Sequence, residues 1–204
     1  MSEHMALENL TVLDLTRVLA GPFCTMMLAD MGANVIKIEV PKGGDDTRSY
    51  PPFRAKNLNG ERESVYFANI NRNKKGITLN LKAPEGKEIF KELVKKADIV
   101  VENYRPGVMD KLGLGYDVLK EINPRIIYAA VSGFGCYGPY HLRPGYDILA
   151  QAMGGMMSIT GSKGGEPTRA GSALGDILGG LHVTIGILAA VNARTITGAE
   201  GAGR

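Results

Sequence analysis

Cysteine and tryptophan are scarce in this sequence of 204 residues, which contains two cysteines and no tryptophan. Cys24 and Cys136 stand far apart, so they have neither the density of a disulfide scaffold nor the close spacing of zinc ligands. We therefore expect a protein of a reducing compartment, the cytoplasm first, with mitochondria or peroxisomes as alternatives. His4 and His141 stand in no recognisable metal-ligand motif, and we assign no metal site.

A leader segment, a long apolar run and a strong net charge are also missing. The first ten residues contain Glu3 and Glu8 and lack the apolar centre of a signal peptide. The longest apolar stretch, 177–191, is rich in glycine, includes His182 and Thr184, and is shorter than the roughly 20 residues of a membrane span. The formal charge of +3 is small and evenly spread. We therefore expect neither a membrane nor a nucleic acid as partner.

Glycine, by contrast, is abundant, with 27 residues of 204, about twice the average frequency. Short apolar runs alternate with segments of helical periodicity, a pattern typical of a mainly parallel sheet with helices on both faces. The expected strands are 11–15, 35–39, 77–81, 99–101 and 126–131. The expected helices are 23–30, 84–96, 108–112, 116–122, 146–157 and 174–193, and 41–62 reads as a polar loop. We therefore predict a Rossmann-like α/β domain.

The first strand is followed by a turn that ends in Gly21 and Pro22 and leads into a helix. No G-x-G-x-x-G sequence occurs in this turn, which disfavours a dehydrogenase that binds a nicotinamide dinucleotide. That alternative would return only if the protein bound NAD. No redox or other permanently bound cofactor is expected.

Six short segments, taken in order, resemble the family III CoA-transferases, a group that includes formyl-CoA:oxalate and carnitine CoA-transferases. They are 13–22 (LDLTRVLAGP), 32–39 (GANVIKIE), 71–75 (NRNKK), 101–107 (VENYRPG), 123–128 (NPRIIY) and 173–176 (ALGD). Each segment is weak alone, whereas the ordered set is specific and covers nearly the whole chain. The resemblance implies an enzyme that moves coenzyme A between an acyl-CoA and a small carboxylic acid.

The resemblance also implies a larger protein, because family members are considerably longer. Residues 1–204 match the amino-terminal part of a large CoA-binding domain that ends in a long helix. The turn at 197–204 corresponds to the place where relatives enter a small domain and a carboxyl-terminal return segment. The chain is expected to be truncated before this small domain. In the family, two subunits interlock as a homodimer. An inactive CoA-binding fragment that needs a partner is therefore an alternative.

Asp176 is the candidate nucleophile, since the resemblance places it at the aspartate of the family's motif. A carboxylate can form an anhydride and then a thioester, and it can leave again. From the sequence alone, an aspartate between Gly175 and an apolar helix starting at Ile177 is more often a helix N-cap. Both roles are compatible, because a helix N-terminus also stabilises an anion.

Further residues fall at positions where the family contacts CoA, a ligand whose phosphates call for cations and backbone donors. These candidate CoA-binding residues are Arg17, Leu19, Ala20, Leu79, Lys82, Asn103, Tyr104, Arg105, Lys111, Arg143, Tyr146 and Asp147. Each cation taken alone is more often a solvated surface charge. Lys111 stands where some relatives have arginine, which weakens bidentate recognition of phosphate.

Tyr146 separates two chemistries of the same fold. The related α-methylacyl-CoA racemases have a histidine at this position, which works with the aspartate to move the α-proton. Tyrosine is a poor replacement, because its ordinary pKa of about 10 is far from neutrality. An acyl-CoA racemase or epimerase therefore remains the alternative, and Asp147 is expected to tune Asp176 electrostatically.

Overall fold

The computed structural model describes residues 4–54, 60 and 62–198, and five parallel strands form its centre. The strands are β1 (Thr11–Asp14), β2 (Asn34–Glu39), β5 (Lys75–Thr78), β6 (Ile99–Glu102) and β7 (Ile127–Ala130). They lie in the order β5-β2-β1-β6-β7, with every neighbouring pair parallel. The predicted parallel α/β architecture is therefore confirmed, with boundaries shifted by one to three residues.

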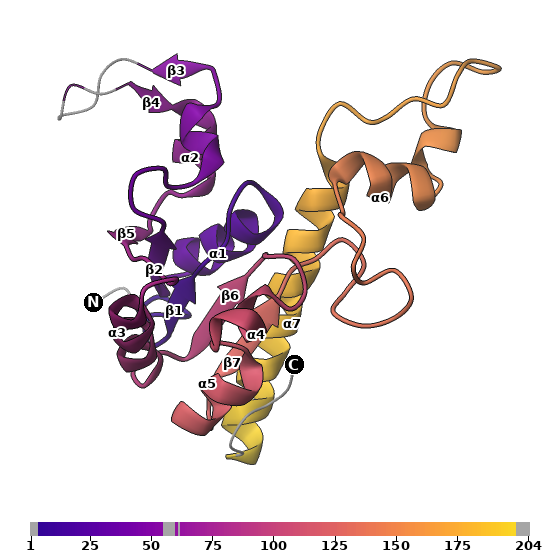
Figure 1. Cartoon of the computed structure of the whole chain (residues 1–204). Helices are drawn as coiled ribbons and strands as arrows, with labels where there is room; N and C mark the ends of the chain where they lie inside the picture. The colour runs from indigo at the N-terminus through magenta and orange to yellow at the C-terminus, as the bar shows by residue number, and fades with distance from the viewer. Residues whose placement is uncertain (1–3, 55–59, 61, 199–204) are drawn as a thin grey trace.

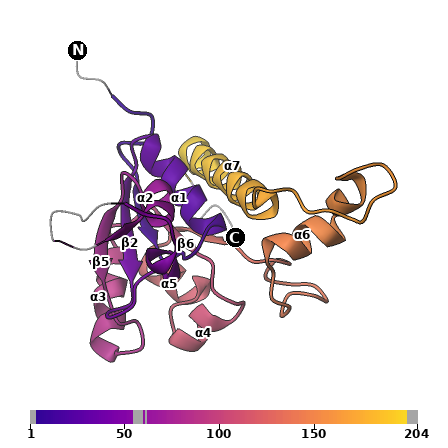
Figure 2. The ribbon, with the colours of Figure 1, turned by 90° about the horizontal axis from the view of Figure 1, so that it is seen from above.

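Helices cover both faces of this sheet (Figure 2). On one face lie α1 (Ala20–Asp30) and α7 (Leu174–Thr197). On the other lie α3 (Pro84–Val94), α4 (Val108–Leu112) and α5 (Tyr116–Ile122). Pro84 opens α3 in its first turn as expected, since its fixed φ suits that position and the missing N–H is not needed there.

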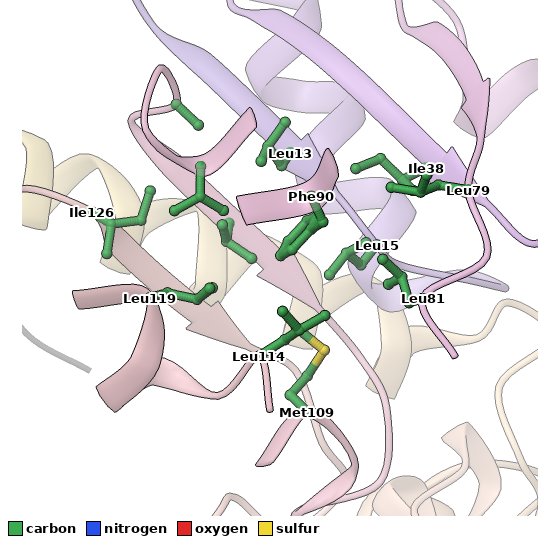
Figure 3. Packing of buried hydrophobic residues seen from close by; sticks show 13 residues of the cluster. Leu13, Leu15, Ile38, Leu79, Leu81, Phe90, Met109, Leu114, Leu119 and Ile126 are labelled. Atoms are coloured by element: carbon green, nitrogen blue, oxygen red, sulfur yellow. The ribbon is translucent and has the colours of Figure 1, made fainter. Parts of the chain in front are cut away.

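The hydrophobic core consists of two layers, because each central strand is buried on both faces. Leu13 and Val100 belong to one layer together with Phe90 of α3, which is fully buried. Figure 3 shows Leu13 and Phe90 within this layer. Val12 and Val101 belong to the opposite layer, which contains residues of α1 and α7. Strands of this kind read as continuous apolar runs rather than alternating patterns, which is why the sequence indicated them clearly.

The segment 41–62 was predicted to be a polar loop, and this prediction was wrong in part, as the elements within and just after it show. It contains a 3₁₀ turn, η1 (Asp46–Ser49), and a short strand, β3 (Phe53–Arg54), whose antiparallel partner β4 (Glu63–Ser64) comes just after it. A helix, α2 (Val65–Ile70), follows directly, and Ser64 caps it by accepting a hydrogen bond from the Phe67 N–H at 3.2 Å.

The helix expected over 146–157 is divided in two. It begins as α6 (Asp147–Met153) and continues as a 3₁₀ turn, η2 (Met156–Ile159), after Gly154 and Gly155. Gly155 has a φ of 79°, a value that favours glycine and interrupts a regular helix. This part of the chain extends away from the sheet (Figure 1).

Helix α7 is longer than expected and is anchored at its far end. Arg194 is buried, and its guanidinium donates to the Asp98 carboxylate at 2.9 Å and to the Arg125 carbonyl at 3.0 Å. These partners precede β6 and β7. Of the turn predicted at 197–204, Thr197 is the last residue of α7 and Gly198 is its C-cap, whereas residues 199–204 lie outside the described residues.

By length and composition, α7 is apolar enough to cross a membrane, and only 17% of its most apolar window is buried. The expectation that this stretch is too short was therefore wrong. The core helix of a soluble protein passes the same test, so the predicted absence of a membrane partner stays a prediction.

Candidate active site

A cavity of about 420 Å³ opens at the carboxyl ends of β1 and β6. The strand order reverses direction between these two neighbours, and such a switch point is where open α/β sheets bind ligands. The wall is formed by the turn after β1, the loop after β6, the loops around 131–134 and 143–146, α6 and the start of α7. The lining residues are Val18, Leu19, Ala20, Asn103, Tyr104, Arg105, Pro106, Val131, Ser132, Gly133, Phe134, Arg143, Pro144, Gly145, Tyr146, Leu149, Ala150, Met153, Gly175, Asp176 and Gly179.

Asp176 lies in the first turn of α7 and lines the cavity. It is not the N-cap, because the helix begins at Leu174 and Ala173 occupies the cap position. Burial and the nearby charge of Asp147 raise the pKa of the Asp176 carboxyl. Among the residues that the structure describes, none donates a hydrogen bond to this carboxylate. The group therefore faces the cavity with its oxygen lone pairs available.

Asp147, by contrast, is held firmly by its neighbours. Its Oδ1 accepts a hydrogen bond from the Gly175 N–H at 2.8 Å, and both oxygens accept from Gln151 Nε2 at 2.9–3.0 Å. Gln151 is buried, and its side-chain Oε1 accepts a hydrogen bond from the Ala170 N–H at 2.8 Å. Asp147 therefore ties α6 to the residue just before Asp176 and places a second negative charge beside it.

Two glycines of α7 allow close packing around the site. A Cβ added at Gly180 would lie 2.4 Å from the carbonyl oxygen of Ala20, so α1 begins directly against α7. A Cβ at Gly175 would lie 2.8 Å from the Ala150 side chain. Any larger residue would push the start of α1 or α6 away from Asp176.

The loop after β6 is positioned by a buried carboxyl group. Glu102 accepts a hydrogen bond from the Tyr104 N–H at 2.7 Å and one from the Tyr128 hydroxyl at 3.2 Å. Burial raises the pKa of Glu102 to about 7. Asn103, the next residue, donates to the Arg17 carbonyl at 2.6 Å and accepts the Arg17 N–H at 2.8 Å. The loops after β1 and β6 are thus joined across the switch point.

The structure brings together most of the candidate residues, and others lie outside the cavity. Those in the lining are Asp176, Leu19, Ala20, Asn103, Tyr104, Arg105, Arg143 and Tyr146. Those outside the lining are Arg17, Leu79, Lys82, Lys111 and Asp147. Of this second group, Arg17 and Asp147 contact lining residues. Leu79 is buried in the core, whereas Lys82 and Lys111 are exposed.

Two residues near the site were missed by sequence reasoning. Tyr66 of α2 lies close enough to Asp176 that, after burial, the charge of Asp176 helps to raise the pKa of its phenol. Ser132 lines the cavity, and its Oγ is buried without a hydrogen-bond partner in the described part of the chain. Neither residue stands in a segment with a distinctive pattern, so only tertiary structure reveals them. The described residues contain no group of three or more histidine, cysteine or acidic side chains placed to hold a metal.

Comparison with known proteins gives one consistent result. Residues 7–202 match the family model described as CoA-transferase family III. Acetyl-CoA:oxalate CoA-transferase of Acetobacter aceti is 50% identical over 94% of this chain and 48% of the relative. Succinyl-CoA:glutarate CoA-transferase of Mus musculus is 50% identical over 94% of this chain and 43% of the relative.

A solved structure agrees with these sequence comparisons. A CAIB/BAIF family protein from Brucella suis superimposes with a TM-score of 0.92 and 45% identity, over 97% of this chain and 52% of the other. The chain thus spans about half the length of the relatives that it matches. On the combined evidence of sequence and fold, the chain belongs to CoA-transferase family III.

Proposed function

We propose that this chain supplies the nucleophile and much of the CoA-facing wall of an enzyme that moves CoA from an acyl-CoA to a free carboxylic acid. The observation that carries the proposal is the Asp176 carboxylate, which lies in the cavity with no hydrogen-bond donor among the described residues. A carboxylate that is not engaged elsewhere can attack a carbonyl carbon.

The proposed reaction uses acyl exchange at Asp176. A carboxylate oxygen attacks the thioester carbonyl, the carbon–sulfur bond breaks, and CoA leaves as the thiolate while a mixed anhydride forms. The thiolate then attacks the aspartyl carbonyl, which gives an aspartyl-CoA thioester and releases the first acid as a carboxylate. The second acid reverses both steps. The thioester bond energy is conserved throughout, so ATP is not required.

The start of α1 supports this chemistry with backbone groups that face the same cavity. Leu19 and Ala20 line it, and the first N–H groups of a helix have no partner within the helix. We propose that these backbone donors hold the oxygen that becomes negative when the thioester is attacked. Arg105 and Arg143 would contact the CoA moiety inside the cavity. Lys82 and Lys111, which lie outside the cavity, would bind the CoA phosphates.

The proposed substrates are an acyl-CoA and a small carboxylic acid, and the acid is left unnamed because the relatives differ in their acids. The proposed assembly is a homodimer in the cytoplasm. The exposed apolar side chains of α7, Leu178 at 42% and Ile185 at 55%, support a protein partner on this helix.

Hydroxylamine trapping tests the proposal directly. The chain is incubated with several acyl-CoAs, treated with hydroxylamine and digested, and its peptides are analysed by mass spectrometry. Hydroxylamine attacks the aspartyl carbonyl and releases CoA thiol or the acyl carboxylate, so Asp176 is expected to become a hydroxamate. A full-length family member serves as the positive control. If Asp176 stays unmodified while the control reacts, the proposed function fails for this chain, and α-proton exchange in deuterated water would then test the racemase.

Asp147→Asn is expected to move the acid limb of the pH–rate profile to lower pH. The substitution keeps an oxygen for the Gly175 N–H but removes the charge that helps to raise the pKa of Asp176. Because the carboxylate form attacks, activity rises as pH passes the Asp176 pKa, and a lower pKa shifts that rise downward. An unchanged acid limb in kcat/KM would contradict electrostatic tuning by Asp147.

A further inference from the structure

The turn between β1 and α1 contains a backbone conformation that its sequence does not favour. Val18 has a φ of 68°, in the left-handed region that β-branched residues avoid. Its side chain is 36% exposed, so tight packing of the valine does not explain the conformation. A strained backbone persists only where its surroundings impose it, and such residues concentrate at functional sites.

A buried ion pair imposes this shape from one side. Asp45 Oδ1 accepts the Val18 N–H at 3.2 Å, and Asp45 Oδ2 accepts from Lys37 Nζ at 2.9 Å. Lys37 in turn donates to the Thr16 carbonyl at 2.8 Å. The side chains of Lys37 and Asp45 are 2% and 0% exposed. The pair therefore holds the turn at two peptide groups, with almost no access for water.

Arg17, which lies between Thr16 and Val18, is held by a side chain of the loop after β6. Asn103, in the loop after β6, contacts both the N–H and the carbonyl of Arg17. Three consecutive residues, 16–18, are thus fixed by side chains from β2, from the loop after β2 and from the loop after β6. Leu19 and Ala20 follow at once and line the same cavity as Asp176.

We propose that Asp45, through its pair with Lys37, is a positioning residue that fixes the turn at 16–18 before the substrate arrives. The inference rests on the proposed function, since it assigns the backbone of Leu19 and Ala20 a fixed place at the reacting carbonyl. Asp45 does not touch the substrate. It acts through the Val18 N–H, and its expected effect is therefore on kcat rather than on affinity, because donors preset for a transition state contribute mainly to turnover.

Removing both buried charges together tests the proposal, since loss of one alone would leave the other uncompensated. Lys37→Met/Asp45→Ala is expected to lower kcat at least tenfold, with KM for acyl-CoA within about threefold. Adding Val18→Gly is expected to restore kcat at least threefold, because glycine adopts the left-handed conformation without support. Equal kcat in the double variant and wild type, or no recovery with glycine, would overturn the proposal.

Lys42→Gly is the matched control. Lys42 also has a positive φ, 56°, but lies in an exposed turn outside the cavity lining. This substitution is expected to leave kcat unchanged and to give no recovery in the double variant. A recovery equal to that of Val18→Gly would indicate a general effect on stability and would contradict the positioning role of Asp45.

Amide hydrogen exchange keeps the test independent of the double variant's folding and of activity. In the wild-type chain, the buried acceptor should slow exchange of the Val18 N–H at least 100-fold relative to an unprotected amide. Free exchange at this amide would overturn the inference even if the enzyme is active. A chain that transfers no CoA and forms no hydroxamate, but protects Val18, would instead refute the proposed function and leave the restrained turn in place.

Discussion

Asp176→Asn is expected to lower CoA transfer on the order of 10⁴-fold or more, since it removes the proposed nucleophile and leaves an amide that attacks thioesters poorly. The carboxylate lies in the cavity lining, and none of the described residues donates a hydrogen bond to it, so little structural role is lost with its charge. Turnover is measured with an acyl-CoA and acid pair that the wild-type protein accepts.

Affinity for CoA separates loss of chemistry from loss of binding. Calorimetric titration should give Asp176→Asn a Kd for CoA within about threefold of wild type, because the CoA contacts are proposed to lie on other residues. Asp147→Asn is the control, since it neutralises the neighbouring carboxylate and should retain turnover at high pH. If the Asp176 variant kept a tenth of the wild-type rate, another group would have to be the nucleophile.

Glu102→Gln is expected to stabilise the protein at pH 8 but much less at pH 5. Burial raises the pKa of Glu102 to about 7, whereas in the unfolded chain it returns toward 4.5. Between these values the unfolded state loses its proton first, so the stability of the wild-type protein falls as the pH rises through this window. The advantage of glutamine over glutamate should grow by about 2 to 3 kcal/mol from pH 5 to pH 8.

Glutamine can replace the protonated acid because both hydrogen-bond partners remain usable. Its carbonyl can accept the Tyr104 N–H, and its amide can donate to the Tyr128 hydroxyl oxygen. Urea unfolding at both pH values measures the difference. Glu121→Gln, an exposed substitution on α5, should change stability by less than about 0.5 kcal/mol at either pH. A difference for Glu102→Gln that does not vary with pH would refute the raised pKa.

The centre of the sheet could be predicted from the sequence because β1 and β6 are buried on both faces. The runs ending at Asp14 and Glu102 are short, apolar and separated by helical patterns, which leaves few alternatives. The elements η1 and β3, within the segment predicted to be a loop, could not be predicted, because their side-chain partners come from elsewhere in the chain. Lys37 lies within a predicted strand, and its buried partner, Asp45, lies in the segment that was predicted to be a loop.

The part of the candidate site that lies within the family's sequence motifs could be predicted. The family resemblance indicated Asp176, Asn103 and Arg105, and the structure places all three in one cavity lining. The helix predicted over 174–193 already contained Asp176, whereas the competing interpretation of Asp176 as the N-cap was wrong, because Ala173 occupies that position. The approach of Tyr66 was not predicted either, because α2 was not expected at all and the distance in sequence gives no hint of contact.

The length of α7 sets where Asp176 stands. The buried Arg194 follows Asp176 by 18 positions, about five full helical turns, so both side chains leave the helix in the same direction. Arg194 is bonded beside the amino ends of β6 and β7, whereas Asp176 lies at their carboxyl ends. One extra residue between them would rotate Asp176 by about 100° and raise it by about 1.5 Å relative to the anchored end. An insertion or deletion in this interval would therefore move Asp176 relative to the other residues of the cavity, whereas a substitution at an exposed position would not.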